Sequence, residues 1–342
     1  MKYMIWNNKG GVGKTFLTYL LSSEYAIKHP DTDVVVADLC PQANVSEMLL
    51  GGNGKGEENL NTCYNNQRTI ASYIKSRYDK SRFGKMGDES EYFVQVCKYN
   101  KEMPSNLYLL PGDTDLDICS TIINYMATAP EKGAWVKSRT FLADLLESFE
   151  IAHKNTAKRI YFFDCNPSFA NYTEMAVIAA ERIIVPCTAD AASLRGIRNL
   201  LRLIYGINTS PLTSAAGDNV FDTFNSKCSD AGIKHPQIHL FIQNKSRVLD
   251  EKATRAYKAH SEEVERIIKE TKKNRGENFT ENNRTVLNLK DGNTLASIVN
   301  HTGLPLSKVR AQKYNIYGKT TQADQGQIDA LCKDLNECLS VL

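Results

Sequence analysis

A glycine-rich loop near the amino terminus constrains this chain more than any other feature. Residues 9–15 read Lys-Gly-Gly-Val-Gly-Lys-Thr and follow the apolar run at residues 3–6. A strand, a glycine turn and a helix start in this order let backbone N–H groups surround a polyphosphate. In such a loop Lys14 reaches the β- and γ-phosphates, and the Thr15 hydroxyl ligates Mg²⁺. The sequence therefore predicts a site for a magnesium-bound nucleotide.

The loop also departs from the common phosphate-loop pattern. Asn8 stands where G-x-x-x-x-G-K-[ST] begins with glycine, and Lys9 follows at a position that this pattern leaves free. This variant resembles the phosphate loop of the ParA/MinD family of P-loop ATPases. In that family the first lysine reaches across a dimer to the nucleotide of the other subunit. The resemblance implies the same role for Lys9.

Two aspartates follow apolar runs in the order that the family has them. Residues 38–44 read Asp-Leu-Cys-Pro-Gln-Ala-Asn and resemble the family's D-x-D-P-Q-x-N segment. Residues 164–168 read Asp-Cys-Asn-Pro-Ser and resemble its D-x-P-P-S segment, which carries Walker B and switch II. An aspartate at such a strand end typically holds Mg²⁺, often through water. Either aspartate alone is as typical of a helix cap or a turn, but the ordered set favours the functional interpretation.

Later segments extend the resemblance over most of the chain. Pro186 and Gly196 match the family's next strand and turn, and Asn244 ends an apolar segment where the family places an asparagine against adenine. Asparagine is equally common in turns for its own reasons. A late family segment is matched by Pro305, Val309, Arg310 and Gly318.

The resemblance implies a site for ATP and Mg²⁺. The implied nucleotide contacts are Lys9, Gly10, Gly11, Val12, Gly13, Lys14, Thr15, Phe16 and Asn244. The implied metal site consists of Thr15, Asp164 and Asp38. The implied catalytic residues are Lys9, Lys14 and Asp38.

The main departure from the family is Cys40. The family has there the second aspartate of D-x-D-P-Q, which is linked to positioning or activating the attacking water. A cysteine is mostly neutral at pH 7, and γ-phosphate charge opposes its ionisation. We therefore expect slow hydrolysis of bound ATP, unless Asp38 or a switch residue takes over the role. Asn166 replaces the usual first proline of switch II, and we expect it to alter how that loop couples nucleotide state to a partner.

Short apolar runs alternate with amphipathic stretches along the chain, which is typical of a parallel sheet with helices on both faces. The expected strands are residues 4–6, 34–37, 108–110, 160–163, 183–185 and 239–242. The expected helices are residues 14–28, 138–152, 172–180 and 197–205. This order predicts an α/β, doubly wound nucleotide-binding fold with a mostly parallel sheet.

No boundary between two domains is visible, so we expect one ATPase domain over residues 1–342 with two insertions. Residues 51–105 are polar, rich in Gly, Asn, Lys and Tyr, and predict a helix near 69–78. Residues 250–284 predict a charged helix over 250–273 followed by a loop. The mixed charges of this helix favour a solvated face, with a partner or DNA contact as the alternative.

Bulk properties narrow the class further. The 342 residues, 42% of them hydrophobic, suffice for one large core. A net charge of +3 is too mild to indicate nucleic-acid binding by itself. Nine cysteines without a C-x-x-C pair indicate neither a zinc nor a ferredoxin-type site, and suit a reducing cytosol. The immediate start of strand and loop leaves no room for a signal peptide, and no apolar run approaches ~18 residues. We predict a cytoplasmic protein with no membrane partner.

The resemblance implies a ParA-like partition ATPase. Such a protein forms a homodimer on ATP binding, binds DNA without sequence preference, associates with the nucleoid, and hydrolyses ATP when a ParB-like adaptor stimulates it. Non-specific DNA binding needs lysines and arginines against phosphates. Two candidate groups exist, each as typical of a solvated surface: Lys245, Arg247, Lys252 and Arg255, and Lys308, Arg310, Lys313 and Lys319.

Other functions on this fold fit the sequence less well. A membrane-bound regulator of the MinD type needs a basic amphipathic helix at the carboxyl end. Here residues 327–342 carry a mainly acidic polar face, and core packing is the favoured interpretation of the apolar stripe Ile328, Leu331, Leu335 and Leu339. An iron–sulfur carrier needs paired cysteines, and ATP-dependent ligases of this fold usually lack the P-Q-x-N continuation. A hydrolysis-poor, ATP-locked dimeric scaffold that recruits protein partners remains the alternative.

Overall fold

The computed structural model describes residues 1–80, 88–156, 158–207, 223–245, 251–282, 284–290 and 292–342. At its centre is an eight-stranded sheet with the order β3-β4-β2-β5-β1-β6-β7-β8. All neighbouring strands pair in parallel except β3 and β4. The strands are β1 (Lys2–Ile5), β2 (Thr32–Leu39), β3 (Val94–Gln95), β4 (Leu107–Leu110), β5 (Lys158–Cys165), β6 (Arg182–Thr188), β7 (Gln237–Lys245) and β8 (Val286–Lys290).

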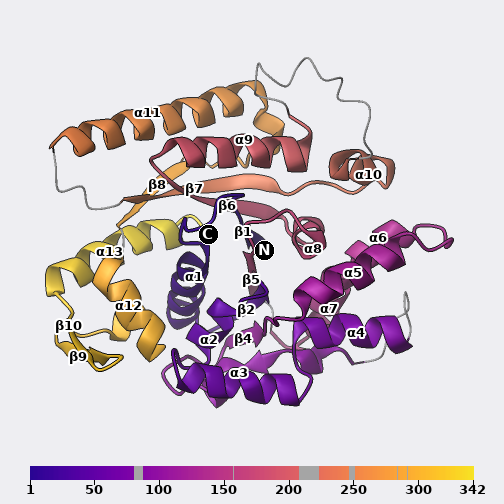
Figure 1. Ribbon diagram of the computed structural model, residues 1–342, viewed down its shortest axis with the longest axis horizontal. Coiled ribbons are helices and arrows are strands. Elements are labelled where there is room, and N and C mark those ends of the chain that lie inside the picture. The colour runs from indigo at the N-terminus through magenta and orange to yellow at the C-terminus, as the bar shows by residue number, and fades with distance from the viewer. Residues whose placement is uncertain (81–87, 157, 208–222, 246–250, 283, 291) are drawn as a thin grey trace.

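Helices cover both faces of this sheet (Figure 1). The longer ones are α1 (Lys14–Lys28), α3 (Lys55–Asn65), α4 (Ile70–Lys80), α5 (Leu116–Ala127), α7 (Phe141–Ala152), α8 (Asn171–Ala179), α9 (Ala191–Tyr205), α11 (Glu251–Asn274), α12 (Asn293–Thr302) and α13 (Gln325–Leu339). Shorter ones are α2 (Asn44–Leu49), α6 (Ala134–Arg139) and α10 (Phe224–Asp230). A small hairpin, β9 (Lys313–Ile316) with β10 (Lys319–Gln322), lies near α12 in the lower left of Figure 1. The prediction of a doubly wound, mostly parallel α/β fold is confirmed.

The central strands are apolar at consecutive positions because each of their two faces packs against helices. On β2, Val34 and Val36 belong to the core that includes α1, α12 and α13, whereas Val35 and Ala37 belong to the core that includes α7, α8 and α9. Successive side chains of a strand point to opposite faces, so a strand buried on both sides has no polar alternation. This is why short apolar runs, and not alternating ones, revealed the strands.

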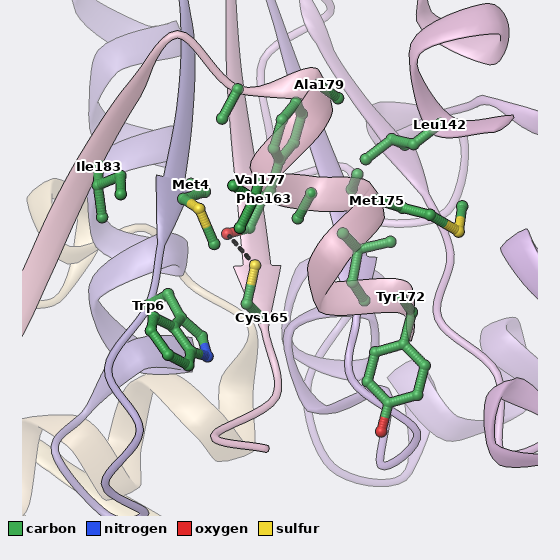
Figure 2. Close-up of a cluster of buried hydrophobic side chains, with 14 of the residues drawn as sticks. Met4, Trp6, Leu142, Phe163, Cys165, Tyr172, Met175, Val177, Ala179 and Ile183 are labelled. Atoms are coloured by element: carbon green, nitrogen blue, oxygen red, sulfur yellow. Dashed lines mark hydrogen bonds between the residues drawn. The ribbon is translucent and has the colours of Figure 1, made fainter. Parts of the chain in front are cut away.

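Figure 2 shows part of the core that includes α7, α8 and α9. Met175 of α8 is fully buried there with Phe163 of β5 and Met4 of β1. Trp6, which follows β1, is fully buried in the same cluster. Helix α8 begins at Asn171, shortly after residues 164–168, so its packing restrains where those residues lie.

Residues 138–152 were expected to form one helix, but the chain forms two. Helix α6 ends at Arg139, and α7 begins at Phe141. Arg139 is buried, and its Nε donates to Glu174 Oε2 at 2.6 Å. The apolar stripe that suggested the helix begins only at Phe141. Helix α5, strand β8 and the β9–β10 hairpin were not predicted.

The two segments expected as insertions share the cores of the main fold. Ile70 and Ile74 of α4 are fully buried in the core that contains α7, and β3 extends the sheet beside β4. Val264 and Ile268 of α11 are buried in the same core. The helix expected at 250–273 is present as α11.

The carboxyl-terminal stripe packs as expected. Ile328, Leu331, Leu335 and Leu339 of α13 are buried in the core that contains α1. Among the described residues, no helix combines the length and the apolar character needed to cross a bilayer.

Candidate functional site

The phosphate loop joins β1 to α1 and owes its shape to two glycines. Gly11 and Gly13 have φ of 71° and 84°, in the left-handed region that favours glycine. A Cβ on Gly13 would also lie 2.7 Å from Nδ2 of Asn244, which closes in on the loop from the end of β7. Helix α1 begins at Lys14, so the loop N–H groups sit at a helix amino terminus.

Lys14 folds back over this loop. Its Nζ donates to the carbonyl oxygens of Lys9 at 2.8 Å and of Asn7 at 3.3 Å. Burial lowers the pKa of Lys14, and the nearby charge of Asp164 partly offsets this. The ammonium group is therefore held where an incoming phosphate exchanges weak carbonyl partners for a charged one.

Asp38 and Asp164 lie side by side because β2 and β5 are neighbours in the sheet, with these two residues in register. Both are buried. Asp38 accepts hydrogen bonds from Cys40 N at 3.1 Å, from Ser46 N at 3.0 Å and from Ser46 Oγ at 2.7 Å. Asp164 Oδ1 accepts from Thr18 Oγ1 at 3.3 Å.

The second oxygen of Asp164, Oδ2, is buried and has no hydrogen-bond partner among the described residues. Burial raises the pKa of Asp164, and the neighbouring charge of Asp38 raises it further. Burial also raises the pKa of Asp38, against the hydrogen bonds from Ser46. Two adjacent buried carboxyl groups, one with a free oxygen, fit a divalent cation, which would favour their ionised forms. The predicted metal residues thus lie together, with Thr15 at the start of α1.

Cys40 lies at the wall of this site as a neutral thiol. It is 9% exposed, and burial, with the charge of Asp38 next, raises its pKa to about 12. A thiol with that pKa holds its proton at physiological pH. It does not supply the carboxylate that the family has at this position.

Lys9 is held within its own chain. Its Nζ donates to Thr188 Oγ1 at 2.7 Å, to Asp190 Oδ2, and to Ser193 Oγ at 3.5 Å. Partial burial by itself would raise the pKa of Asp190. The hydrogen bonds from Lys9 and Thr188 outweigh this effect and lower the pKa to about 2. These partners lie at the end of β6 and in the first turn of α9, two elements in which sequence reasoning singled out only Pro186 and Gly196.

Gly196 and Pro186 support the loop through Asn7. Asn7 Nδ2 donates to the carbonyl oxygen of Pro186 at 2.8 Å, and its Oδ1 accepts from Lys9 N at 3.1 Å. A Cβ on Gly196 would lie 2.2 Å from Asn7 Oδ1, so only glycine allows α9 to pack this closely against the loop.

Gly112 supports Asp38 in the same way and was missed. A Cβ at this position would lie 2.8 Å from Asp38 Cγ, and Gly112 N donates to Ser46 Oγ at 2.9 Å. The signal in the sequence is the Pro111-Gly112 pair, which directly follows the expected strand at residues 108–110 and is typical of a turn.

The segment after β5, which was expected to resemble switch II, is joined by two hydrogen bonds to residues just before the phosphate loop. Trp6 Nε1 donates to the carbonyl oxygen of Asn166 at 2.9 Å, and Asn8 Nδ2 donates to that of Pro167 at 3.1 Å. Asn166 Oδ1 accepts from Ser168 N at 3.0 Å, which gives the segment a turn that a proline side chain could not form.

These elements surround a cavity of about 690 Å³. Segments far apart in the sequence line it, including Asn53 from the segment expected as an insertion and Asn300 from α12. Asn53 N donates to the carbonyl oxygen of Asn300 at 3.1 Å. Sequence reasoning assigned neither residue to the site. The cavity lining consists of Gly10, Gly11, Gly13, Lys14, Thr15, Phe16, Cys40, Gln42, Asn44, Glu47, Met48, Asn53, Cys165, Asn166, Pro167 and Asn300.

The structure describes only one of the two basic groups that are candidates for DNA binding. Arg247 and the side chains of Lys245, Lys252 and Arg255 lie outside the described residues. In the other group, Lys308 pairs with Glu102 Oε2 at 3.1 Å. Its remaining members, Arg310, Lys313 and Lys319, are exposed on or beside the β9–β10 hairpin.

With this geometry established, comparison with known proteins gives a family. Residues 2–214, more than half of the chain, match the family described as the AAA domain. The chain belongs to this family of ParA/MinD-like P-loop ATPases. Among curated proteins, no sequence matches the chain.

Solved structures share the fold of this P-loop ATPase at low sequence identity. The ATP complex of an McdA variant from Cyanothece has a TM-score of 0.57 and 13% identity, with 100% of this chain and 96% of that chain covered. A plasmid partition protein, described as putative, from Borrelia burgdorferi with bound AMPPNP has a TM-score of 0.53 and 14% identity, with coverages of 100% and 98%. Protein DIP2308 from Corynebacterium diphtheriae has a TM-score of 0.55 and 16% identity, with coverages of 87% and 95%.

Proposed function

We propose that this protein binds Mg·ATP, forms an ATP-sandwich homodimer, and acts as a nucleotide switch in plasmid or chromosome partition. In this proposal the dimer binds DNA without sequence preference on the nucleoid, and a ParB-like adaptor stimulates slow hydrolysis. The observation that carries the proposal is the position of Lys9. Lys14 folds back over its own loop, whereas the side chain of Lys9 points to Asp190 and Thr188, and it reaches a nucleotide bound by another subunit once it leaves these two partners.

Residues that line the cavity, together with Asn244, Asp38 and Asp164 next to the loop, would divide the work of holding the nucleotide. Gly10 to Phe16 supply loop N–H groups and Lys14 to the phosphates, and Asn244 lies against the loop at the end of β7. Thr15, Asp164 and Asp38 would hold Mg²⁺. When bound, the cation neutralises phosphate charge and orients the β- and γ-phosphate oxygens.

Hydrolysis in this site lacks one group that would activate water. Cys40 holds a neutral thiol at the wall of the cavity, and Asp38 is already occupied by three hydrogen bonds from Ser46 and Cys40. A positioned general base contributes roughly 10²–10⁴-fold to a rate. Bound ATP therefore persists, and the dimer is long-lived until a partner completes the site.

Dimerisation and turnover of purified protein test the proposal together. With Mg·ATP, wild type should form dimers in light scattering, and Lys9→Gln should remain monomeric while still binding a fluorescent ATP analogue. The control variant Lys158→Gln removes an exposed lysine at the start of β5, at the other end of this strand from Asp164. This variant should dimerise as wild type does. Wild type that stays monomeric at all ATP concentrations, or Lys9→Gln that dimerises equally well, would contradict the proposal.

The second candidate function is an ATP-locked scaffold that recruits protein partners. The neutral Cys40 thiol favours it, because a dimer that cannot hydrolyse ATP has no intrinsic route to release. The two candidates differ in whether duplex DNA or an adaptor raises the turnover. Acceleration by either supports the partition switch, whereas stable ATP dimers with no stimulated turnover support the scaffold.

A further inference from the structure

Helix α9 carries a row of arginines that neither sequence motif nor cavity accounts for. Arg195, Arg198 and Arg202 stand at positions i, i+3 and i+7, which places them within about 60° of one another around the helix. They span about 10 Å along its axis at 1.5 Å per residue. All three are exposed. The opposite side of α9, with Ile197, Leu200, Leu201 and Ile204, is buried in the core.

These arginines have no neutralising partners in the described chain. None of the three makes a hydrogen bond or ion pair to any described residue, and α9 itself contains no acidic residue. Glu263 of α11 is close enough for the charge of Arg198 to lower its pKa. Hydrogen bonds from Arg266 are the main cause of its lowered pKa, and the charge of Arg198 contributes less. Glu263 is thus already paired, with Arg266 at 2.7 Å.

The row begins close to Asp190, the partner of Lys9, which the proposed function places at the dimer interface. Asp190 caps the amino end of α9 through Ser193 N at 2.8 Å, and the same carboxylate contacts Lys9. Arg195 lies five residues farther along the helix. A Lys9 that reaches the nucleotide of a second subunit brings the amino ends of both α9 helices towards one two-fold axis.

We propose that the arginine row of α9, defined as Arg195, Arg198 and Arg202, is the surface that contacts the phosphates of duplex DNA. This inference rests on the proposed function, since the two rows would come together in the ATP dimer. Arginine binds phosphate through a planar, bidentate fork, and a rigid helix presents three such forks at a fixed spacing. Two rows related by a two-fold axis match the two antiparallel strands of a duplex better than they match a single acidic peptide. The contact would carry no sequence information.

The test measures binding of a fluorescent 24-base-pair duplex of arbitrary sequence to the full chain, at several salt concentrations. Wild type is compared with the triple variant Arg195→Gln, Arg198→Gln and Arg202→Gln. The matched control, Arg310→Gln, Lys313→Gln and Lys319→Gln, removes the same charge from the exposed group near the hairpin. Each protein is measured without nucleotide and with a non-hydrolysable ATP analogue, and its dimerisation is followed by light scattering.

We expect the α9 variant to lose at least about tenfold in affinity for the duplex. The slope of log K against log salt is negative, and each lost phosphate contact reduces its magnitude by about 0.9. The magnitude should therefore decrease by up to about 5 in the dimer, which loses six arginines, and by about 3 in the monomer, which loses three. The control variant should stay within about twofold of wild type. Nucleotide binding and dimerisation should be unchanged in both variants, since none of the six residues lines the cavity.

Three results would overturn the inference. The first is a DNA affinity and salt slope that the α9 substitutions leave unchanged, including a wild type that does not bind DNA. The second is a larger loss in the control variant. The third is tighter binding of wild type to poly-glutamate than to the duplex at equal charge, which would assign the row to an acidic polypeptide. A protein that never dimerises contradicts the proposed function but still tests the row, through the monomer slope.

Discussion

Lys9 Nζ donates a hydrogen bond to Oδ2 of Asp190, while Oδ1 of the same carboxylate accepts from Ser193 N and caps helix α9. One side chain therefore fixes both the second loop lysine and the start of a helix. If Lys9 acts in another subunit, as we propose, it must first leave this partner. The contact therefore couples the position of Lys9 within one subunit to the position of α9.

Replacing Asp190 with asparagine should favour the dimer. Asparagine caps a helix as well as aspartate does, so Asp190→Asn removes the ion pair and keeps the cap. A partly exposed pair contributes about 0.2–1 kcal/mol, which corresponds to roughly 1.4- to 5-fold per lysine in the dimer dissociation constant. Sedimentation of both proteins with a non-hydrolysable ATP analogue measures this change. Weaker dimerisation of Asp190→Asn would show that the pair does not restrain Lys9.

Restoring a carboxylate at position 40 should raise turnover. Cys40→Asp places a group that can accept a proton at the cavity wall, and we expect at least about tenfold faster ATP hydrolysis. The same change should lower the unfolding temperature of the nucleotide-free protein, because a third carboxyl group joins Asp38 and Asp164. Cys40→Ser serves as the control of similar size without a charge. Turnover of Cys40→Asp no higher than that of wild type would sink the slow-hydrolysis hypothesis.

Stability should depend on pH through Asp164. Because the folded chain holds the proton of this buried group more tightly than the unfolded chain does, ionisation opposes folding as pH rises above about 4. Asp164→Asn keeps the shape and has no proton to lose, so its stability relative to wild type should increase from pH 4 to pH 8. The slope should be at most about 1.4 kcal/mol per pH unit for one proton.

Urea unfolding of both proteins at five pH values gives this difference directly. Asp190, whose pKa is lowered, is ionised in both folded and unfolded chains above about pH 5 and adds no slope there. Saturating Mg·ATP should remove the disadvantage of wild type, since the cation favours the ionised carboxyl group. A stability difference that stays constant with pH would mean that Asp164 is not protonated in the folded protein.

Gly112→Ala should displace Asp38 and weaken nucleotide binding, although Gly112 does not line the cavity. The added methyl group would lie 2.8 Å from Asp38 Cγ and 3.1 Å from Ala43 Cα, so Asp38 or its loop must move. We expect a loss of about 1–3 kcal/mol in unfolding free energy and weaker binding of Mg·ATP. Gly276→Ala is the matched control, because a Cβ there meets no atom within 4 Å. Equal stability of the two variants would contradict the close packing of Gly112 on Asp38.

The sequence by itself determined the fold class and the chemistry of the loop. Short apolar runs followed by Lys14, Asp38 and Asp164 were enough to predict a parallel sheet with polar residues at the carboxyl ends of its strands. These signals are local, since a buried strand must be apolar and a phosphate turn needs glycine at particular positions. The roles assigned to Lys9, Asn244 and the metal residues remain predictions.

Only the tertiary structure decided which residues meet around that loop. The in-register placement of Asp38 and Asp164 depends on β2 and β5 being neighbours, although 125 or so residues separate them in the chain. The contact of Lys9 with Asp190 and the packing of Gly112 on Asp38 also join distant segments. No local pattern encodes such contacts, because they arise from the order of strands in the sheet. The sheet order, and with it the side on which each helix packs, is set by how the apolar faces of the whole chain are buried together.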